Sequence, residues 1–118
     1  MDLSAYRFPL FIDLKGKKAV IVGGGKIALR RAGVLLSFGA DVTIIAPVCE
    51  AVPEGATFLQ RPYEEGDLAG AFLAVAATNC REVNFQVGQE ANAAGILVSV
   101  ADRKEESNFF FPAICAGS

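Results

Sequence analysis

The chain lacks histidine altogether, and its three cysteines show none of the spacings typical of metal sites or disulfide frameworks. Histidine is the commonest general base and metal ligand, so acid–base chemistry here must use Asp, Glu, Lys, Tyr or Cys. Cys49, Cys80 and Cys115 are odd in number and lie far apart. We therefore expect three reduced thiols and no metal site, which indicates a cytoplasmic protein.

Charge is also scarce, and no apolar run is long. Charged residues make up 20% of the chain, with 11 Lys and Arg against 13 Asp and Glu and a formal net charge of −2. A nucleic-acid-binding module normally carries a basic face, so we expect no nucleic-acid partner. The longest apolar run falls well short of the roughly 18 to 20 residues that a membrane helix needs. The first residues do not resemble a signal peptide, so we expect no membrane association.

Apolar residues, in contrast, are abundant and make up 53% of the 118 residues. They suffice for one domain, residues 1–118, with a single core. They occur in short continuous runs, which are typical of strands buried on both faces of a parallel sheet. The runs predict strands at 18–22, 41–46, 56–60, 71–78, 96–101 and 108–114. Helical patterns alternate with them, so the sequence predicts an α/β fold of Rossmann type, a doubly wound parallel sheet of about six strands.

Two helices are predicted between these strands. The first follows a run of three glycines and ends near Gly39. The second is expected to begin at Asn79 as its N-cap, with Glu82 completing a capping box, and to end at Gly95.

The glycine run has the pattern G-x-G-x-x-A, formed by Gly23, Gly25 and Ala28, between the first strand and the first helix. In dinucleotide-binding folds the first glycine allows a tight turn, the second lets the backbone approach a pyrophosphate, and the small third residue lets helix and strand pack closely. The helix N-terminus then holds the anion. We therefore expect a dinucleotide to contact Gly23, Gly24, Gly25, Lys26, Ile27 and Ala28. The simpler alternative is that the glycines serve only the turn.

The acid that usually binds the adenosine ribose is missing after the second strand, where the chain reads Ile45-Ala46-Pro47-Val48. No Arg or Lys stands there to hold the additional phosphate of NADP. We therefore expect NAD, with ribose contacts from the main chain around Pro47 and Val48. Thr78, at the end of the fourth strand, is expected beside the bound NAD.

Asp102 follows the fifth predicted strand, so it should emerge at the carboxyl edge of the sheet, where open α/β folds bind ligands. In a chain without histidine, this carboxylate is the candidate general base. The alternative is an ordinary solvated loop acid or a cap of the following turn. Arg103 and Lys104 beside it are either surface charges or contacts for an acidic substrate.

Four stretches taken together resemble the NAD-binding domain of siroheme synthases, which are precorrin-2 dehydrogenases and in some cases also sirohydrochlorin ferrochelatases. The stretches are FPLFIDLKGKKAVIVGGGKIALRRAGVLL, GADVTIIAP, AVAATN with REVN, and GILVSVADRKEESNFFFPAI. Their order covers nearly the whole chain, and the first and last are more specific than the glycine turn. The family also has an Ala-Pro-like end to the second strand, so the missing ribose acid is a family trait.

The resemblance implies oxidation of the tetrapyrrole precorrin-2 to sirohydrochlorin, with NAD accepting the hydride. In some members Fe²⁺ is then inserted. The family uses a single catalytic aspartate after the fifth strand, and Asp102 matches it. The family also has a helical dimerisation region and a C-terminal segment, so we expect these 118 residues to be the first domain of a longer homodimeric protein.

Two other functions fit parts of the sequence. A non-enzymatic NAD-sensing module would need the glycine turn but no catalytic carboxylate. A chelatase without redox activity would bind metal and macrocycle only.

Overall fold

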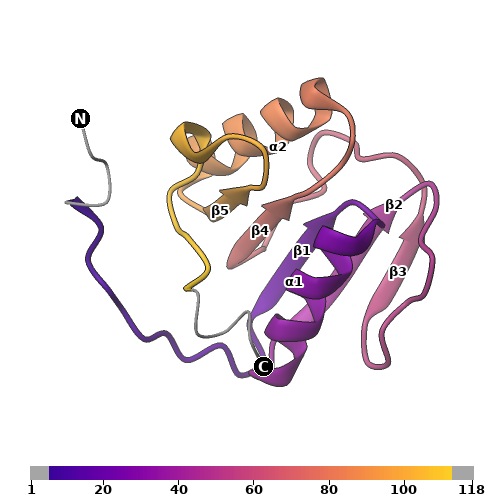
Figure 1. Ribbon diagram of the computed structural model, residues 1–118, viewed down its shortest axis with the longest axis horizontal. Coiled ribbons are helices and arrows are strands. Elements are labelled where there is room, and N and C mark those ends of the chain that lie inside the picture. Colours follow the sequence, from indigo (N-terminus) through magenta and orange to yellow (C-terminus); the bar gives the residue numbers. More distant parts are fainter. Residues whose placement is uncertain (1–5, 113–118) are drawn as a thin grey trace.

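The computed structural model describes residues 6–112, which form one parallel sheet with the strand order β3-β2-β1-β4-β5 (Figure 1). Along the chain the elements are β1 (Lys18–Val22), α1 (Lys26–Ser37), β2 (Asp41–Ala46), β3 (Thr57–Gln60), β4 (Leu73–Ala76), α2 (Arg81–Ala94), β5 (Leu97–Val100) and the 3-10 helix η2 (Lys104–Glu106). Every strand pair is parallel. The predicted fold class is confirmed, because this order is that of a Rossmann sheet.

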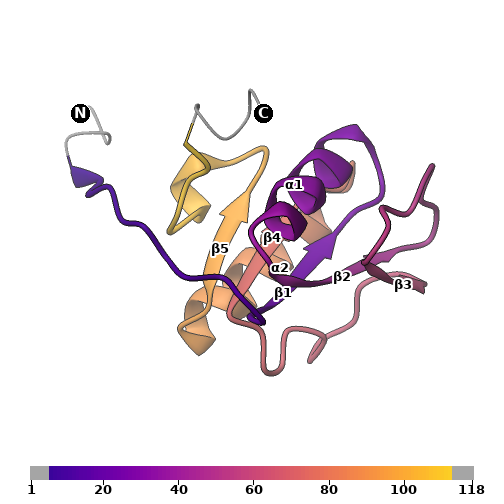
Figure 2. The ribbon, with the colours of Figure 1, turned by 90° about the horizontal axis from the view of Figure 1, so that it is seen from below.

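The two helices cover opposite faces of the sheet (Figure 2). Side chains alternate along β1, so Ala19 and Ile21 join the core beneath α1, whereas Val20 and Val22 join the core beneath α2. All four are almost completely buried. This explains the continuous apolar runs, because a strand covered on both faces has no side for polar residues.

The sixth predicted strand, 108–114, is not formed by residues 108–112; Ala113 and Ile114 lie outside the described residues. The outer edge of β5 is bonded instead by two side chains and by the backbone amide of Asn108, which donates to the carbonyl oxygen of Val98 (2.9 Å). The amide of Val98 donates to Asn108 Oδ1 (2.7 Å) and that of Val100 to Ser107 Oγ (2.8 Å). These bonds satisfy the amide donors that a sixth strand would have used, so the prediction of about six strands is corrected to five within residues 6–112.

Two of the three phenylalanines of that segment nevertheless contact the core. Phe109 and Phe111 pack partly buried against the core beneath α1, with ring centroids 5.3 Å apart. The guanidinium of Arg31 in α1 lies 4.3 Å from the centre of the Phe111 ring. The closing segment therefore extends the α1 side of the molecule without entering the sheet.

Candidate functional site

The loops that follow four of the parallel strands meet at one edge of the sheet. They pack so tightly that two positions of the first loop, Gly23 and Gly24, have no room for a side chain. Gly23 has a φ of +132°, and a Cβ there would overlap the carbonyl oxygen of Ala77, after β4. A Cβ on Gly24 would overlap the carbonyl oxygen of Val48, after β2. Both glycines therefore have a structural reason that is independent of any ligand.

Gly25 differs, because a Cβ there would meet no atom within 4 Å and its φ of −89° suits any residue. It is the N-cap of α1, and the first bond of the helix runs from the amide of Leu29 to its carbonyl oxygen (2.9 Å). The cap makes no side-chain hydrogen bond, and the first turn holds no acid. Free N–H groups and the positive end of the helix dipole thus meet open space, which is the arrangement that binds a pyrophosphate. These residues fit a dinucleotide.

A cleft of about 350 Å³ lies beside this turn. It brings together six of the predicted cofactor residues, namely Gly23, Gly24, Gly25, Pro47, Val48 and Thr78. Of the other three, Lys26 and Ile27 are exposed at the start of α1 and do not line the cleft. Ala28 is fully buried in the core beneath α1, so its side chain serves the close packing of helix and strand.

Sequence reasoning missed part of the lining, which includes Pro62, Tyr63, Cys80 and Val83. Pro62 and Tyr63 follow β3, as Pro47 and Val48 follow β2, so their place after a strand was the available signal. None of the residues that line the cleft is charged. The lining therefore offers neither an acid for the ribose hydroxyls nor a cation for a further phosphate.

Tyr63 is fixed in the cleft wall by an acid from α2. Its hydroxyl donates to Glu90 Oε1 (2.7 Å), while the amide of Gly66 donates to Glu90 Oε2 (3.2 Å). Burial, together with the hydrogen bond to the Glu90 carboxylate, raises the pKa of the Tyr63 phenol well above its usual value. Tyr63 therefore remains a neutral donor and a rigid wall residue.

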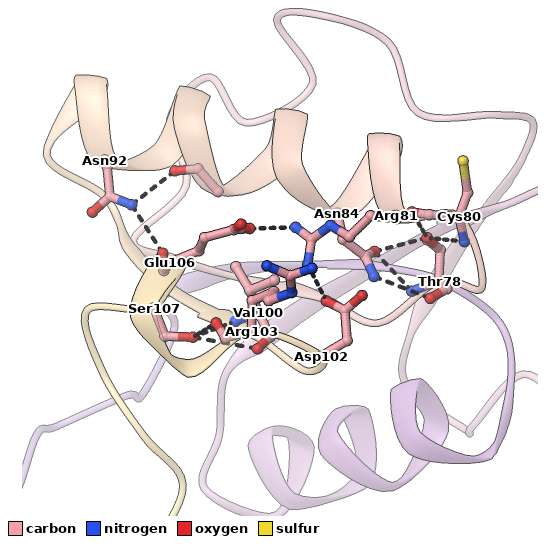
Figure 3. A network of polar contacts seen from close by, with 11 residues as sticks. Thr78, Cys80, Arg81, Asn84, Asn92, Val100, Asp102, Arg103, Glu106 and Ser107 are labelled. Carbon is pink, nitrogen blue, oxygen red and sulfur yellow. Dashed lines mark hydrogen bonds and ion pairs between the residues drawn. The ribbon is translucent and has the colours of Figure 1, made fainter. Parts of the chain in front are cut away.

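The turn from β4 into α2 is held by Thr78 and Asn84. Asn84 is 1% exposed; its Oδ1 accepts from the amide (3.0 Å) and hydroxyl (2.7 Å) of Thr78, and its Nδ2 donates to the Thr78 carbonyl oxygen (3.1 Å) (Figure 3). The prediction of Asn79 as N-cap was wrong: Cys80 is the N-cap, and its amide donates to Thr78 Oγ1 (3.1 Å). The helix begins one residue later than predicted and has no side-chain cap, and the hydroxyl of Thr78 holds only the amide of the N-cap residue.

Asp102 lies directly after β5, at the same edge of the sheet as Thr78, since the amide of Ala101 donates to the carbonyl oxygen of Ala76 at the end of β4 (2.9 Å). Its side chain is 45% exposed, and its Oδ1 accepts from Arg81 Nη1 (2.9 Å). Asp102 does not line the cleft. Arg103 and Lys104 are exposed. The predicted base is therefore an accessible carboxylate beside, not inside, the glycine-lined cleft.

Residues 6–112 contain neither a group of metal-binding side chains nor a membrane-spanning helix. No three His, Cys, Asp or Glu side chains of this part gather into a group that could hold a metal ion. None of its helices has the length and apolar character needed to cross a bilayer.

An open parallel sheet with this strand order, a glycine turn before α1 and a cleft at its carboxyl edge defines a dinucleotide-binding protein. Residues 10–113 match the family described as "Putative NAD(P)-binding", and the chain belongs to this family. The predicted cofactor, NAD, agrees with that membership.

The chain is also similar to named proteins of siroheme biosynthesis. The chain is 46% identical to the "Probable multifunctional siroheme biosynthesis protein HemA" of Ruminiclostridium josui, over 92% of this chain and 22% of that protein. It is also 46% identical to a siroheme synthase of Stutzerimonas stutzeri, over 90% of this chain and 24% of that protein. A solved structure titled "SirC, precorrin-2 dehydrogenase" aligns with a TM-score of 0.75 and 31% identity, over 91% of this chain and 55% of that one. The chain thus spans less than a quarter of the length of these two relatives and about half of that structure.

Proposed function

We propose that this chain is the NAD-binding part of an enzyme that oxidises precorrin-2 to sirohydrochlorin in siroheme biosynthesis. The observation that carries the proposal is the accessible Asp102 carboxylate, one strand away from a neutral, glycine-lined cleft. The similarity to siroheme synthases and to a precorrin-2 dehydrogenase supports the choice of substrate.

Each group of the site has a part in this reaction. The free N–H groups at the start of α1 hold the pyrophosphate against Gly25, which leaves room for it. The main chain at Pro47 and Val48 would hold the ribose, and Thr78 lines the same cleft. When bound, NAD supplies the hydride acceptor. Oxidation of the macrocycle removes one hydride and one proton, and Asp102 accepts the proton.

Replacement of the carboxylate by its isosteric amide tests the proposal. In the protein that carries this chain, supplied with precorrin-2 and NAD, Asp102→Asn should lower kcat for NADH formation by about 10²-fold or more, which is the usual contribution of a general base. NAD affinity should not change, because Asp102 does not line the cleft. Asp41→Asn, an exposed acid at the opposite end of the sheet, is the matched control. Normal turnover of Asp102→Asn would refute the catalytic role, and NAD binding without any NADH formation in the wild type would favour the NAD-sensing function.

The neutral lining supports NAD over NADP. A site that prefers NADP normally provides a cation for the 2′-phosphate, and none lines this cleft. Calorimetric titration should give a lower Kd for NAD than for NADP. The preference for NAD is wrong if NADP binds more tightly.

Three further parts of the proposal concern the whole protein. Insertion of Fe²⁺ into sirohydrochlorin is tested by adding Fe²⁺ after the oxidation and following siroheme formation. Homodimerisation is supported by the exposed apolar side chains of Phe8, Leu10 and Phe11, and sedimentation of the protein measures it. A cytoplasmic location is supported by the free thiols of Cys49 and Cys80.

A further inference from the structure

Arg81 occupies a position at which a positive charge does not stabilise its own helix. It is the first residue of α2, at the positive end of the helix dipole, where an acid would stabilise the helix and a cation opposes it. Its guanidinium reaches the segment after β5 and is shared by two carboxylates, those of Asp102 and Glu106 (Figure 3). These contacts, and not the stability of α2, give a reason for an arginine at this position.

The two carboxylates differ in how firmly they are held. Glu106 is the last residue of η2, its side chain is 22% exposed, and its carbonyl oxygen accepts from Asn92 Nδ2 in α2 (3.1 Å). The side chain of Asp102 is 45% exposed, and only its Oδ1 is bonded to Arg81 (2.9 Å). Within residues 6–112, Oδ2 of Asp102 accepts no hydrogen bond. Glu106 is therefore the carboxylate that anchors the Arg81 guanidinium, and Asp102 is the carboxylate that keeps one oxygen free to accept a proton.

We propose that Arg81 is a positioning residue for the proton-accepting carboxylate: anchored by Glu106, it fixes Oδ1 of Asp102 and leaves Oδ2 to receive the proton. This inference rests on the proposed function. A planar guanidinium suits the role, because its two Nη atoms can each hold one carboxylate in a fixed relative orientation. Removing it leaves Asp102 on an exposed loop with several rotamers, of which few place Oδ2 correctly.

The test uses the same NADH assay on the protein that carries this chain. Arg81→Gln should lower kcat by about 10-fold to 10²-fold, the range expected for a misplaced catalytic group, with KM for NAD unchanged. The kcat of Arg81→Lys should lie between those of Arg81→Gln and the wild type, since an ammonium group keeps the positive charge but cannot hold two carboxylates in a fixed relative orientation. Glu106→Gln should lower kcat by a smaller factor, because it loosens the anchor only. Arg30→Gln, which changes an exposed arginine of α1, is the matched control and should behave as the wild type.

A double-mutant cycle separates positioning from a general effect on folding. If Arg81 acts through Asp102, Arg81→Gln should not lower the residual turnover of Asp102→Asn any further. Wild-type kcat in Arg81→Gln, while Asp102→Asn is impaired, would overturn the role of Arg81 and leave the proposed function intact. Equal losses from Arg81→Gln in both backgrounds, or a rise in KM for NAD with unchanged kcat, would also overturn it. Normal turnover of Asp102→Asn would refute the catalytic role of Asp102 and, with it, the positioning role of Arg81. The proposed function itself fails only if the wild type forms no NADH from precorrin-2 and NAD.

Discussion

At the scale of single residues, the three consecutive glycines are needed for different physical reasons. Gly23 and Gly24 are required by the packing of neighbouring loops, since a Cβ at either position would overlap a backbone carbonyl oxygen. Among residues 6–112 no contact requires a glycine at Gly25, because a Cβ there would meet no atom within 4 Å and its φ is ordinary. We therefore propose that the bound dinucleotide is the reason for Gly25, and only this glycine should separate binding from stability when it is changed.

Gly25→Val should accordingly weaken NAD binding without unfolding the protein. We expect Kd to rise at least about 10-fold, which corresponds to roughly 1.4 kcal/mol, because the new side chain occupies the approach of the pyrophosphate to the helix N-terminus. The melting temperature should stay close to that of the wild type. Calorimetry with NAD and thermal unfolding measure the two quantities.

Gly33→Ala is the control for Gly25→Val. It lies in α1, also meets no atom within 4 Å, and should raise stability by roughly 0.5–1 kcal/mol with unchanged Kd. Wild-type affinity in Gly25→Val would contradict the assignment of the pyrophosphate to this turn.

At the scale of elements, the start of α2 organises the site. Thr78 accepts from the amide of Cys80, the N-cap residue, Asn84 in the first turn of α2 hydrogen-bonds to Thr78, and Arg81 donates to Asp102. One helical turn thus contacts both the cleft and the candidate base. The start of α2 therefore fixes the position of Asp102 relative to the cleft.

Asn84→Ala should destabilise the fold markedly. Three hydrogen bonds to Thr78 disappear from a residue that is 1% exposed, and groups left without a partner in such a place cost about 1–3 kcal/mol. Urea denaturation measures the change in the free energy of unfolding. Asn79→Ala is the matched control: Asn79 is exposed and is not the N-cap, so the change should stay within about 0.5 kcal/mol. Larger destabilisation by Asn79→Ala than by Asn84→Ala would contradict this description of the turn.

At the scale of the whole molecule, the sheet separates two cores, and the loop between β3 and β4 is tied down by one partly buried ion pair. Arg61 donates to both oxygens of Asp67 (2.8 and 2.9 Å), and the amide of Glu64 donates to Asp67 Oδ2 (2.7 Å). The hydrogen bonds from Arg61 lower the pKa of the Asp67 carboxyl below its ordinary value of 3.8, against the opposing effect of burial. Asp67 therefore binds its proton less readily in the folded than in the unfolded protein.

This shift predicts how stability responds to acid. Because the folded pKa is depressed, the contribution of Asp67 is complete above the ordinary value of 3.8 and is lost as the pH falls through the folded value. The free energy of unfolding of Asp67→Asn should thus fall less steeply in this range than that of the wild type. Urea unfolding at a series of pH values measures this difference in slope. Glu65→Gln, which changes an exposed neighbouring acid, is the control. Parallel curves for the wild type and Asp67→Asn would show that the pair does not contribute.

Much of the fold was predictable because its signals are local. A strand covered on both faces must be apolar throughout, so continuous runs located β1, β2, β4 and β5, whereas β3 is a mostly exposed edge strand. Glycines marked the ends of both helices. The glycine turn and the acid after β5 were likewise found, since position after a strand of a parallel sheet fixes the edge at which a residue emerges.

The sequence by itself therefore determined the fold class, the cleft edge and the position of Asp102. Only the tertiary structure decided which side chains meet there. Arg81 pairs with carboxylates 21 and 25 residues away, Tyr63 with an acid 27 residues away, and the edge of β5 is closed by two side chains instead of a sixth strand. The physical reason is that local patterns report burial and backbone conformation, whereas a hydrogen-bonded pair depends on where distant segments are placed by packing.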